Sequence, residues 1–170
     1  MFETSIIADV SKPEFYRQLA QQLEALLAGE SDAIANAANT AALLYHTMPD
    51  LNWAGFYFLR GEGELVLGPF QGKPACVRIA AAQGVCGAAV AGRQPVLVED
   101  VEAFPGHIAC DSASRSELVV PLVSGDEILG VLDLDSPHVA RFDSEDQIGI
   151  ERVAALYMAA SYGPFRKLDP

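Results

Sequence analysis

The chain has 170 residues, which fits one domain over residues 1–170, and no apolar run approaches the roughly 18 residues of a membrane-spanning helix. Hydrophobic residues make up 51% and charged residues 20%, a balance typical of a packed globular protein that excludes a disordered one. With 11 basic and 23 acidic residues the net charge is −12, so nucleic acid and anionic membranes are not expected partners.

The first two patterned segments are predicted to be helices. Residues 13–28 end before Gly29, and their apolar side chains recur at steps of three and four along one face: Tyr16, Leu19, Leu23, Leu26 and Leu27. Residues 32–48 form an alanine-rich second helix, with Ser31 or Asp32 as its cap and Pro49 after its end.

The middle of the chain alternates short strands with turns. The aromatic run 53–60 predicts a strand, 61–64 its turn and 65–67 the returning strand. We then expect a loop at 68–75, a strand at 77–81, a short helix at 85–91 and a strand at 95–98. Residues 99–114 have too little apolar periodicity for a regular element, and a loop this long is often functional.

Two strands and a helix complete the chain. Residues 117–123 and 127–135 are predicted strands, and the last helix begins at Asp143, with Asp146 completing a capping box. Short turns between neighbouring strands indicate an α/β domain of the α+β type, in which helices pack on an antiparallel sheet. The buried stripe of the last helix is predicted to be Ile148, Val153, Leu156, Tyr157 and Ala160.

Two aspartates in the last predicted strand mark a candidate site. Asp133 and Asp135 fall on one strand face because side chains alternate, and carboxylates on an otherwise apolar strand are costly without partners. They either lie just past the strand end, where they face water or cap Ser136, or they have a function. In that case they form a pocket for a cation, or one of them is a carboxyl with a raised pKa that can donate a proton.

Glu117 joins these aspartates for only one length of the intervening turn. A three-residue turn, 124–126, places Glu117 opposite Asp133 on the same face. A two-residue turn, Gly125-Asp126, directs Glu117 to the other face, and the sequence does not choose between the two.

Trp53 and Tyr57 share one face of the strand 53–60, and Phe56 and Phe58 take the other. The first pair either walls a pocket for an apolar or sulfur-bearing side chain or packs in the core.

The three cysteines are Cys76, Cys86 and Cys110, and no residues stand at the spacing of zinc ligands, so we expect no metal site. Their odd number, and an N-terminus without the pattern of a signal peptide, favour a cytoplasmic protein over a disulfide-stabilised secreted one. Cys86, among small apolar residues, fits a core position.

Cys110 fits a reactive thiol, because it lies in the polar loop near a possible helix start, where a thiolate would be stabilised. Lys73 or Arg78 could stabilise a thiolate at Cys76 in the same way. His107 precedes Cys110 by three residues, and we expect it to be an exposed loop residue rather than the partner of a thiol.

Several segments together resemble a known family: Trp53-Ala-Gly-Phe-Tyr57, Gly84-Val-Cys-Gly-Ala-Ala, residues 100–111, Ser116-Glu-Leu-Val-Val-Pro-Leu and Leu129-Gly-Val-Leu-Asp-Leu-Asp-Ser. With cysteines spaced by 10 and 24 residues, they are similar to the free methionine-(R)-sulfoxide reductases, enzymes built on a GAF domain. The resemblance covers nearly the whole chain. It implies a six-stranded antiparallel sheet with helices on one face and a closed ligand pocket on the other.

The resemblance also implies roles for the cysteines. Cys110 would be the nucleophile, Cys76 the main resolving cysteine and Cys86 an alternative one. No cofactor would be bound, and thioredoxin, with its NADPH-dependent reductase, would supply the electrons. The chain could form a homodimer.

For the pocket, the resemblance implies that Trp53 and Tyr57 hold the methyl-sulfoxide end of free methionine sulfoxide. Glu117, Asp133 and Asp135 would bind its ammonium group and polarise its oxygen. Three clustered acids cannot all ionise cheaply, so one is expected to keep a proton and act as a general acid. Two other interpretations are a GAF module that senses a small molecule without catalysis and a thiol redox regulator.

Overall fold

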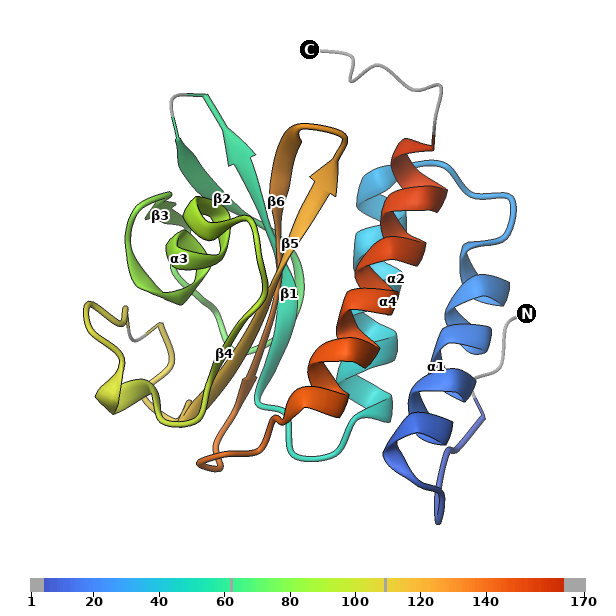
Figure 1. Ribbon diagram of the computed structural model, residues 1–170. Coiled ribbons are helices and arrows are strands. Elements are labelled where there is room, and N and C mark those ends of the chain that lie inside the picture. Colours follow the sequence, from blue (N-terminus) through green and yellow to red (C-terminus); the bar gives the residue numbers. More distant parts are fainter. Residues whose placement is uncertain (1–4, 62, 109, 164–170) are drawn as a thin grey trace.

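The structure is a computed structural model that describes residues 5–61, 63–108 and 110–163. An antiparallel six-stranded sheet, in the order β3-β2-β1-β6-β5-β4, forms its centre (Figure 1). The strands are β1 (Trp53–Arg60), β2 (Glu64–Gly72), β3 (Arg78–Ala80), β4 (Val96–Val98), β5 (Ser116–Ser124) and β6 (Glu127–Ser136). The expected six-stranded antiparallel sheet is therefore confirmed.

Three helices cover one face of this sheet: α1 (Lys12–Leu27), α2 (Ala33–Thr47) and α4 (Ser144–Tyr162). Figure 1 shows α2 and α4 next to the sheet and α1 beyond them. The expected layer of helices on one face is therefore confirmed. A fourth helix, α3 (Gly84–Gly92), lies on the opposite face and corresponds to the short helix predicted at 85–91. Within the described residues, no helix is long and apolar enough to cross a membrane.

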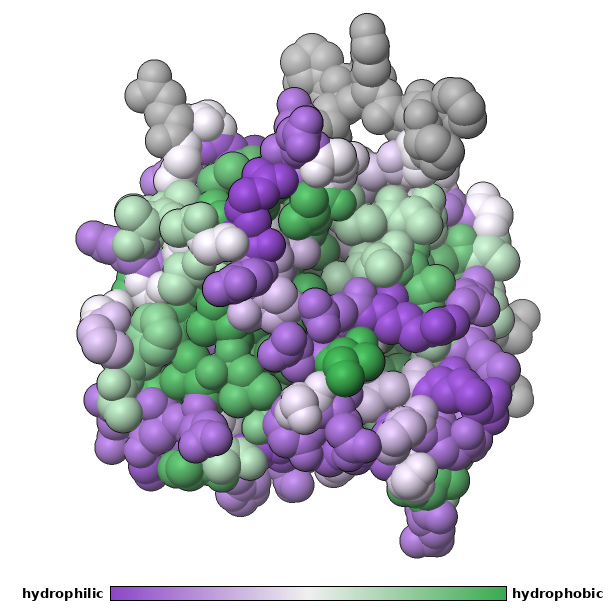
Figure 2. All heavy atoms as spheres, viewed as in Figure 1, coloured by the Kyte–Doolittle hydropathy of each residue, from purple (hydrophilic) through white to green (hydrophobic). Residues whose placement is uncertain are grey.

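The sheet is buried on both faces because alternate residues of its central strands enter two separate cores. Phe56, Leu118 and Leu132 belong to the core between the sheet and the three helices. Tyr57, Val119 and Val131 belong to a second core beneath α3. Figure 2 shows hydrophilic and apolar residues mixed over α1 and α4, and apolar residues gathered on the side of α3 and β4.

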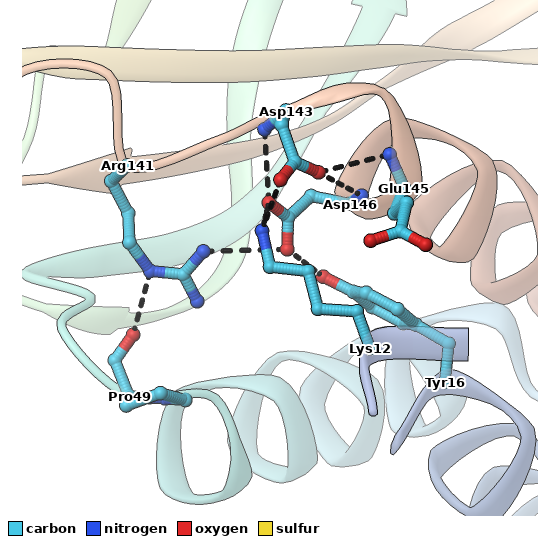
Figure 3. Close-up of polar contacts among 7 residues, drawn as sticks. All are labelled: Lys12, Tyr16, Pro49, Arg141, Asp143, Glu145 and Asp146. Carbon is cyan, nitrogen blue, oxygen red and sulfur yellow. Dashed lines mark hydrogen bonds and ion pairs between the residues drawn. The ribbon is translucent and has the colours of Figure 1, made fainter. Parts of the chain in front are cut away.

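One buried carboxylate ties α1 to the start of α4 (Figure 3). Asp146 Oδ1 accepts a hydrogen bond from the Tyr16 hydroxyl at 2.7 Å and one from Arg141 at 3.3 Å. Asp146 Oδ2 accepts from Lys12 Nζ at 2.6 Å and from the backbone N–H of Asp143 at 2.9 Å, which completes the predicted capping box. These partners compensate for the burial of the charge.

Two predicted features of the elements are wrong. Ile148 is 66% exposed and not part of the buried stripe of α4, because α1 packs on a neighbouring face where the Tyr16 ring lies over Gly149. The residues 68–72, predicted as loop, continue β2, because β1 offers them backbone partners from Gly55 to Trp53.

A bulge in β6 decides on which face of the sheet Glu117 lies. The turn has two residues, since Ser124 pairs with Glu127 and Val123 with Ile128, but Leu122 then pairs with Gly130. Leu129 is therefore the extra residue of a bulge, which shifts the remaining register by one. Glu117 pairs with Asp135, on the same face as the aspartates, although neither turn considered from the sequence predicts this pairing.

Candidate functional site

A small cavity of about 40 Å³ lies between the sheet and α3. Strands β1, β5 and β6 form its floor, while α3 and the loops before β3 and β5 form its rim. Seven candidate residues from the sequence line it: Trp53, Tyr57, Cys86, Cys110, Glu117, Asp133 and Asp135. The expected pocket on the face opposite the three helices is thus present.

Cys110 is joined to Cys76 by a disulfide, with the two Cα atoms 5.4 Å apart. Cys110 lines the cavity, whereas Cys76, on the loop before β3, is not one of the residues that line it. The Tyr57 hydroxyl donates a hydrogen bond of 3.0 Å to the carbonyl oxygen of Cys76, which fixes that loop to β1. Cys110 stands at a bend and not at a helix start, so the expected stabilisation of its thiolate by a helix is wrong.

The aromatic wall of the cavity is a stack of three rings. Trp53 stacks on Tyr57 at 5.8 Å between centroids and on Phe70 of β2 at 5.4 Å. Trp53 Nε1 is buried and has no hydrogen-bond partner among the residues that the structure describes. Phe56 and Phe58 enter the core on the other face of the sheet. Trp53 and Tyr57 line the cavity, so this pair forms a pocket wall in addition to packing in the core.

The acidic wall combines Glu117 of β5 with Asp133 and Asp135 of β6. Glu117 and Asp133 are each only 6% exposed, and within the described part of the chain Asp133 Oδ1 has no hydrogen-bond partner. The interpretation that these aspartates merely face water past the strand end is therefore wrong.

Burial is the main cause that raises the pKa of all three carboxyls. The pKa of Glu117 lies well above its usual range because it is buried and faces the charges of Asp133 and Asp135. Burial and the charge of Asp135 raise the pKa of Asp133. Burial raises the pKa of Asp135 to about 7, against a hydrogen bond from Ser114 that lowers it. Near neutral pH the cluster therefore holds protons, as expected from the sequence.

Cys86, the remaining thiol, is buried and points at the acids. Its Sγ donates to Asp133 Oδ2 at 3.5 Å. Burial and the charges of Asp133 and Glu117 raise its pKa, so it stays a protonated thiol. Among the described residues, the ligand atoms of Cys86, Glu117 and Asp133 form a group within 4.8 Å that is compact enough to hold a metal ion. Spacing along the sequence missed this group because its members come from α3, β5 and β6.

His107 also faces the acids, with Nε2 3.7 Å from Glu117 Oε2 and a side chain only 16% exposed. The prediction of an exposed histidine is wrong because a turn, closed by the bond from His107 N–H to the Phe104 carbonyl, folds the loop over the cavity. Burial lowers the pKa of His107.

Sequence reasoning missed a polar network beside the disulfide. Asp111 accepts from Lys73 Nζ at 3.3 Å, from the backbone N–H of Ala113 at 3.0 Å and from Asn52 Nδ2 at 3.2 Å. Asn52 also donates to Ser114 Oγ at 3.0 Å. The position of Asp111 next to Cys110 was the one available signal, but its partners are distant in sequence.

Known proteins share this architecture. The GAF domain family matches residues 35–160. The free methionine-R-sulfoxide reductase of Escherichia coli is 54% identical over 146 residues, covering 86% of this chain and 88% of that one.

Solved structures agree. The free methionine-R-sulfoxide reductase of Neisseria meningitidis in complex with its substrate has a TM-score of 0.90 and 45% identity, covering 94% of this chain and 95% of that one. A putative GAF sensor protein from Burkholderia vietnamiensis has a TM-score of 0.86 and 57% identity, covering 90% and 97%.

Proposed function

We propose that this chain, which belongs to the GAF domain family and within it to the free methionine-R-sulfoxide reductases, reduces the (R)-sulfoxide of free methionine to methionine. The observation that carries the proposal is the position of Cys110. It lines a cavity with one aromatic and one acidic wall, and it is bonded to a second cysteine outside that cavity.

In the first step, the Cys110 thiolate attacks the sulfoxide sulfur while the sulfoxide oxygen receives a proton. The oxygen is a poor leaving group until it is protonated, and the acidic wall holds such a proton near neutral pH. We assign the donated proton to the Glu117–Asp133 pair and the ammonium group to Asp135, which ionises more readily. The protonated oxygen passes as hydroxyl to the Cys110 sulfur, the bonds that joined the methionine sulfur to this oxygen and to Cys110 break, and methionine leaves. Cys110 is then a sulfenic acid, oxidised by two electrons as the sulfoxide is reduced.

Trp53 and Tyr57 suit the methyl end of the substrate, because an aromatic face accepts an apolar, sulfur-bearing group. The acidic wall suits an ammonium group beside that side chain, which free methionine carries and an internal residue of a peptide does not.

In the second step, the Cys76 thiol attacks the Cys110 sulfenic acid, a disulfide forms and water is released. The Cα separation of 5.4 Å supports Cys76 as the resolving cysteine. Cys86 is the alternative, although its thiol faces the acids. A dithiol then reduces the disulfide by exchange, and we propose thioredoxin, renewed by its NADPH-dependent reductase, with no bound cofactor.

We further propose that the protein works in the cytoplasm, where thiols are kept reduced, and that it forms a homodimer through its terminal helices. Ile148 on α4, 66% exposed, supports such a contact. Light scattering at micromolar concentration tests it, and a monomer there would contradict it.

The function is tested with purified protein, a thiol reductant and the separate enantiomers of free methionine sulfoxide. We expect loss of the (R) form only. Binding without turnover would instead favour a GAF sensor, and thiol oxidation by peroxide with the sulfoxide untouched would favour a redox regulator.

Two variants separate the steps. Cys110→Ser should form no methionine, whereas Cys76→Ser should release one equivalent and then stall when thioredoxin is the reductant. Methionine is counted by chromatography after single-turnover mixing. Repeated turnover by Cys110→Ser with thioredoxin would refute the assignment of the nucleophile.

A further inference from the structure

We infer that Lys73 and Asp111 form an ionic clasp that positions the resolving cysteine, Cys76, against Cys110. The inference rests on the proposed function for its catalytic meaning, but the clasp itself concerns only the disulfide and the two loops that carry it. Both residues act through the cysteines and are positioning residues.

The clasp joins the two cysteine loops directly. Lys73 lies three residues before Cys76 and Asp111 directly follows Cys110, and Lys73 Nζ is 3.3 Å from Asp111 Oδ1. The intervening backbone on each side has no regular secondary structure to hold the cysteines in place. An attraction between the loops therefore narrows the positions that Cys76 can take relative to Cys110.

The acidic half of the clasp is anchored. The Asp111 side chain is only 10% exposed and accepts hydrogen bonds from Ala113 and Asn52, in addition to Lys73. Asn52 is itself held, since its backbone N–H donates to the carbonyl of Asp135 on β6 at 3.1 Å. Asp111 is thus a fixed anion at the end of the sheet.

The basic half is free to move by comparison. The Lys73 side chain is 68% exposed, and Asp111 is its hydrogen-bond partner among the described residues. The Cys76 end of its loop is held by the hydroxyl of Tyr57. Asn52, just before β1, and Tyr57, within β1, thus support the two cysteine loops from one strand, and the clasp closes the gap between them.

A second basic residue provides a natural comparison. Arg78 lies two residues after Cys76, is also exposed, and pairs with Glu64 of the adjacent strand β2. If Lys73 acted only by raising the positive potential near the Cys76 thiol, Arg78 would act in the same way. The clasp assigns the effect to Lys73, because Arg78 has its partner on β2 and not on the loop of Cys110.

The clasp and the disulfide should favour each other. Closing the disulfide brings Lys73 to Asp111, so by reciprocity the ion pair favours the disulfide over the two thiols. The balanced reaction is that of the protein dithiol with oxidised dithiothreitol, which gives the protein disulfide and reduced dithiothreitol. An ion pair with one exposed partner should change this equilibrium constant by about two- to fivefold.

The experiment poises the whole protein in mixtures of reduced and oxidised dithiothreitol at pH 7 and low ionic strength. The fraction of disulfide is read by alkylation and intact mass. Lys73→Met should lower the equilibrium constant by about two- to fivefold, and Lys73→Arg should restore it. Arg78→Met, the matched control, should leave it unchanged. At 1 M salt the difference between Lys73→Met and the unsubstituted protein should shrink.

A second readout mixes the reduced proteins with one equivalent of free methionine-(R)-sulfoxide. Formation of the disulfide should lag behind release of methionine more in Lys73→Met than in Arg78→Met. Equal effects of the two variants, or a loss in Lys73→Met that salt does not diminish, would overturn the clasp. If Lys73→Met shifted the disulfide equilibrium as expected but the unsubstituted protein did not reduce the sulfoxide, the proposed function would be overturned and the clasp would stand.

Discussion

Asp135 is an acidic residue of the pocket that titrates near neutral pH, and its burial opposes folding. Its pKa is 3.8 in an exposed carboxyl and about 7 in the folded protein. Well below pH 3.8 both the folded and the unfolded chain carry the proton, and the residue has no effect on stability. As the pH rises towards 7 the unfolded chain ionises first, so the free energy of unfolding falls; above 7 it falls no further for this reason.

Asp135→Asn should therefore stabilise the protein by about 1–3 kcal/mol at pH 8, and by much less at pH 4. Urea unfolding of the oxidised protein and of the oxidised variant at both pH values measures this difference. Glu117, Asp133 and Asp111 are present in both, so the comparison is between the two proteins at each pH. The same substitution should slow turnover, because the amide carries no charge for the ammonium group. A less stable variant with normal kinetics would mark Asp135 as structural.

Glu117→Gln removes a carboxyl that holds a proton beside Asp133 while keeping its size. We expect release of methionine in a single turnover to slow by about 10²–10⁴-fold, the usual contribution of a general acid. Circular dichroism checks that the variant folds. A rate within a factor of two of the unsubstituted protein would exclude Glu117 from the proton transfer.

Among the elements, the helices and most strands could be predicted because periodicity and end signals are local. Asp32 caps α2, as one of the two candidates, and Asp143 and Asp146 form the capping box of α4. Faces of strands were also predictable, as for Trp53 and Tyr57. The pairing of Glu117 was not, because it depends on a one-residue bulge at Leu129 that neither hydrophobic pattern nor turn length reveals.

The close contacts around the bulge make Gly130 necessary. A Cβ added at Gly130 would lie 2.1 Å from the Tyr57 carbonyl oxygen and 2.9 Å from Phe58 Cα, both backbone atoms of β1. Gly130→Ala must push β1 and β6 apart, and we expect a loss of roughly 2–5 kcal/mol in urea unfolding.

Gly125→Ala is the control, since Gly125 has positive φ but open space around it. Its cost should be about 1 kcal/mol, from backbone strain alone. Equal losses in the two variants would show that close approach of the strands is not what requires glycine at position 130.

The junction of α1 and α4 contains a buried carboxylate that stabilises the fold, in contrast to the carboxyls of the pocket, whose burial opposes folding. Asp146 is fully paired, with Tyr16, Lys12 and Arg141 around it (Figure 3). Asp146→Ala leaves the buried Tyr16 hydroxyl without its acceptor, whereas Lys12 keeps Asp143 and Arg141 keeps the carbonyl of Pro49. We expect a loss of about 1–3 kcal/mol in urea unfolding with unchanged turnover per folded molecule. Glu145→Gln, on the same turn but exposed, should change stability by less than about 0.5 kcal/mol. Lost turnover in folded Asp146→Ala would mean that the helical layer influences the pocket.

On the scale of the whole molecule, the two faces of the sheet have different tasks. The core beneath α2 and α4 is built from apolar side chains such as Leu118, Leu132 and Tyr157, each 0% exposed. The opposite core surrounds a thiol and three carboxyls that oppose folding unless they hold protons. The core beneath α2 and α4 therefore stabilises the fold, and this offsets the destabilising burial of the carboxyls that the chemistry of the opposite core requires.

The disulfide changes the stability of the whole chain during each proposed cycle. It closes a loop with a sequence separation of 34 residues, and restricting the unfolded chain by that length favours the folded state by about 3–4 kcal/mol. The oxidised protein should therefore unfold at higher urea concentration than the reduced one, with both compared at pH 7. Cys76→Ser should match the reduced protein under either condition, whereas Cys86→Ser, which keeps the pair, should retain the difference between oxidised and reduced forms. If oxidised and reduced protein unfolded at the same midpoint, strain in the closed loops would have to offset the entropic gain, and reduction would then be easier than the loop length implies.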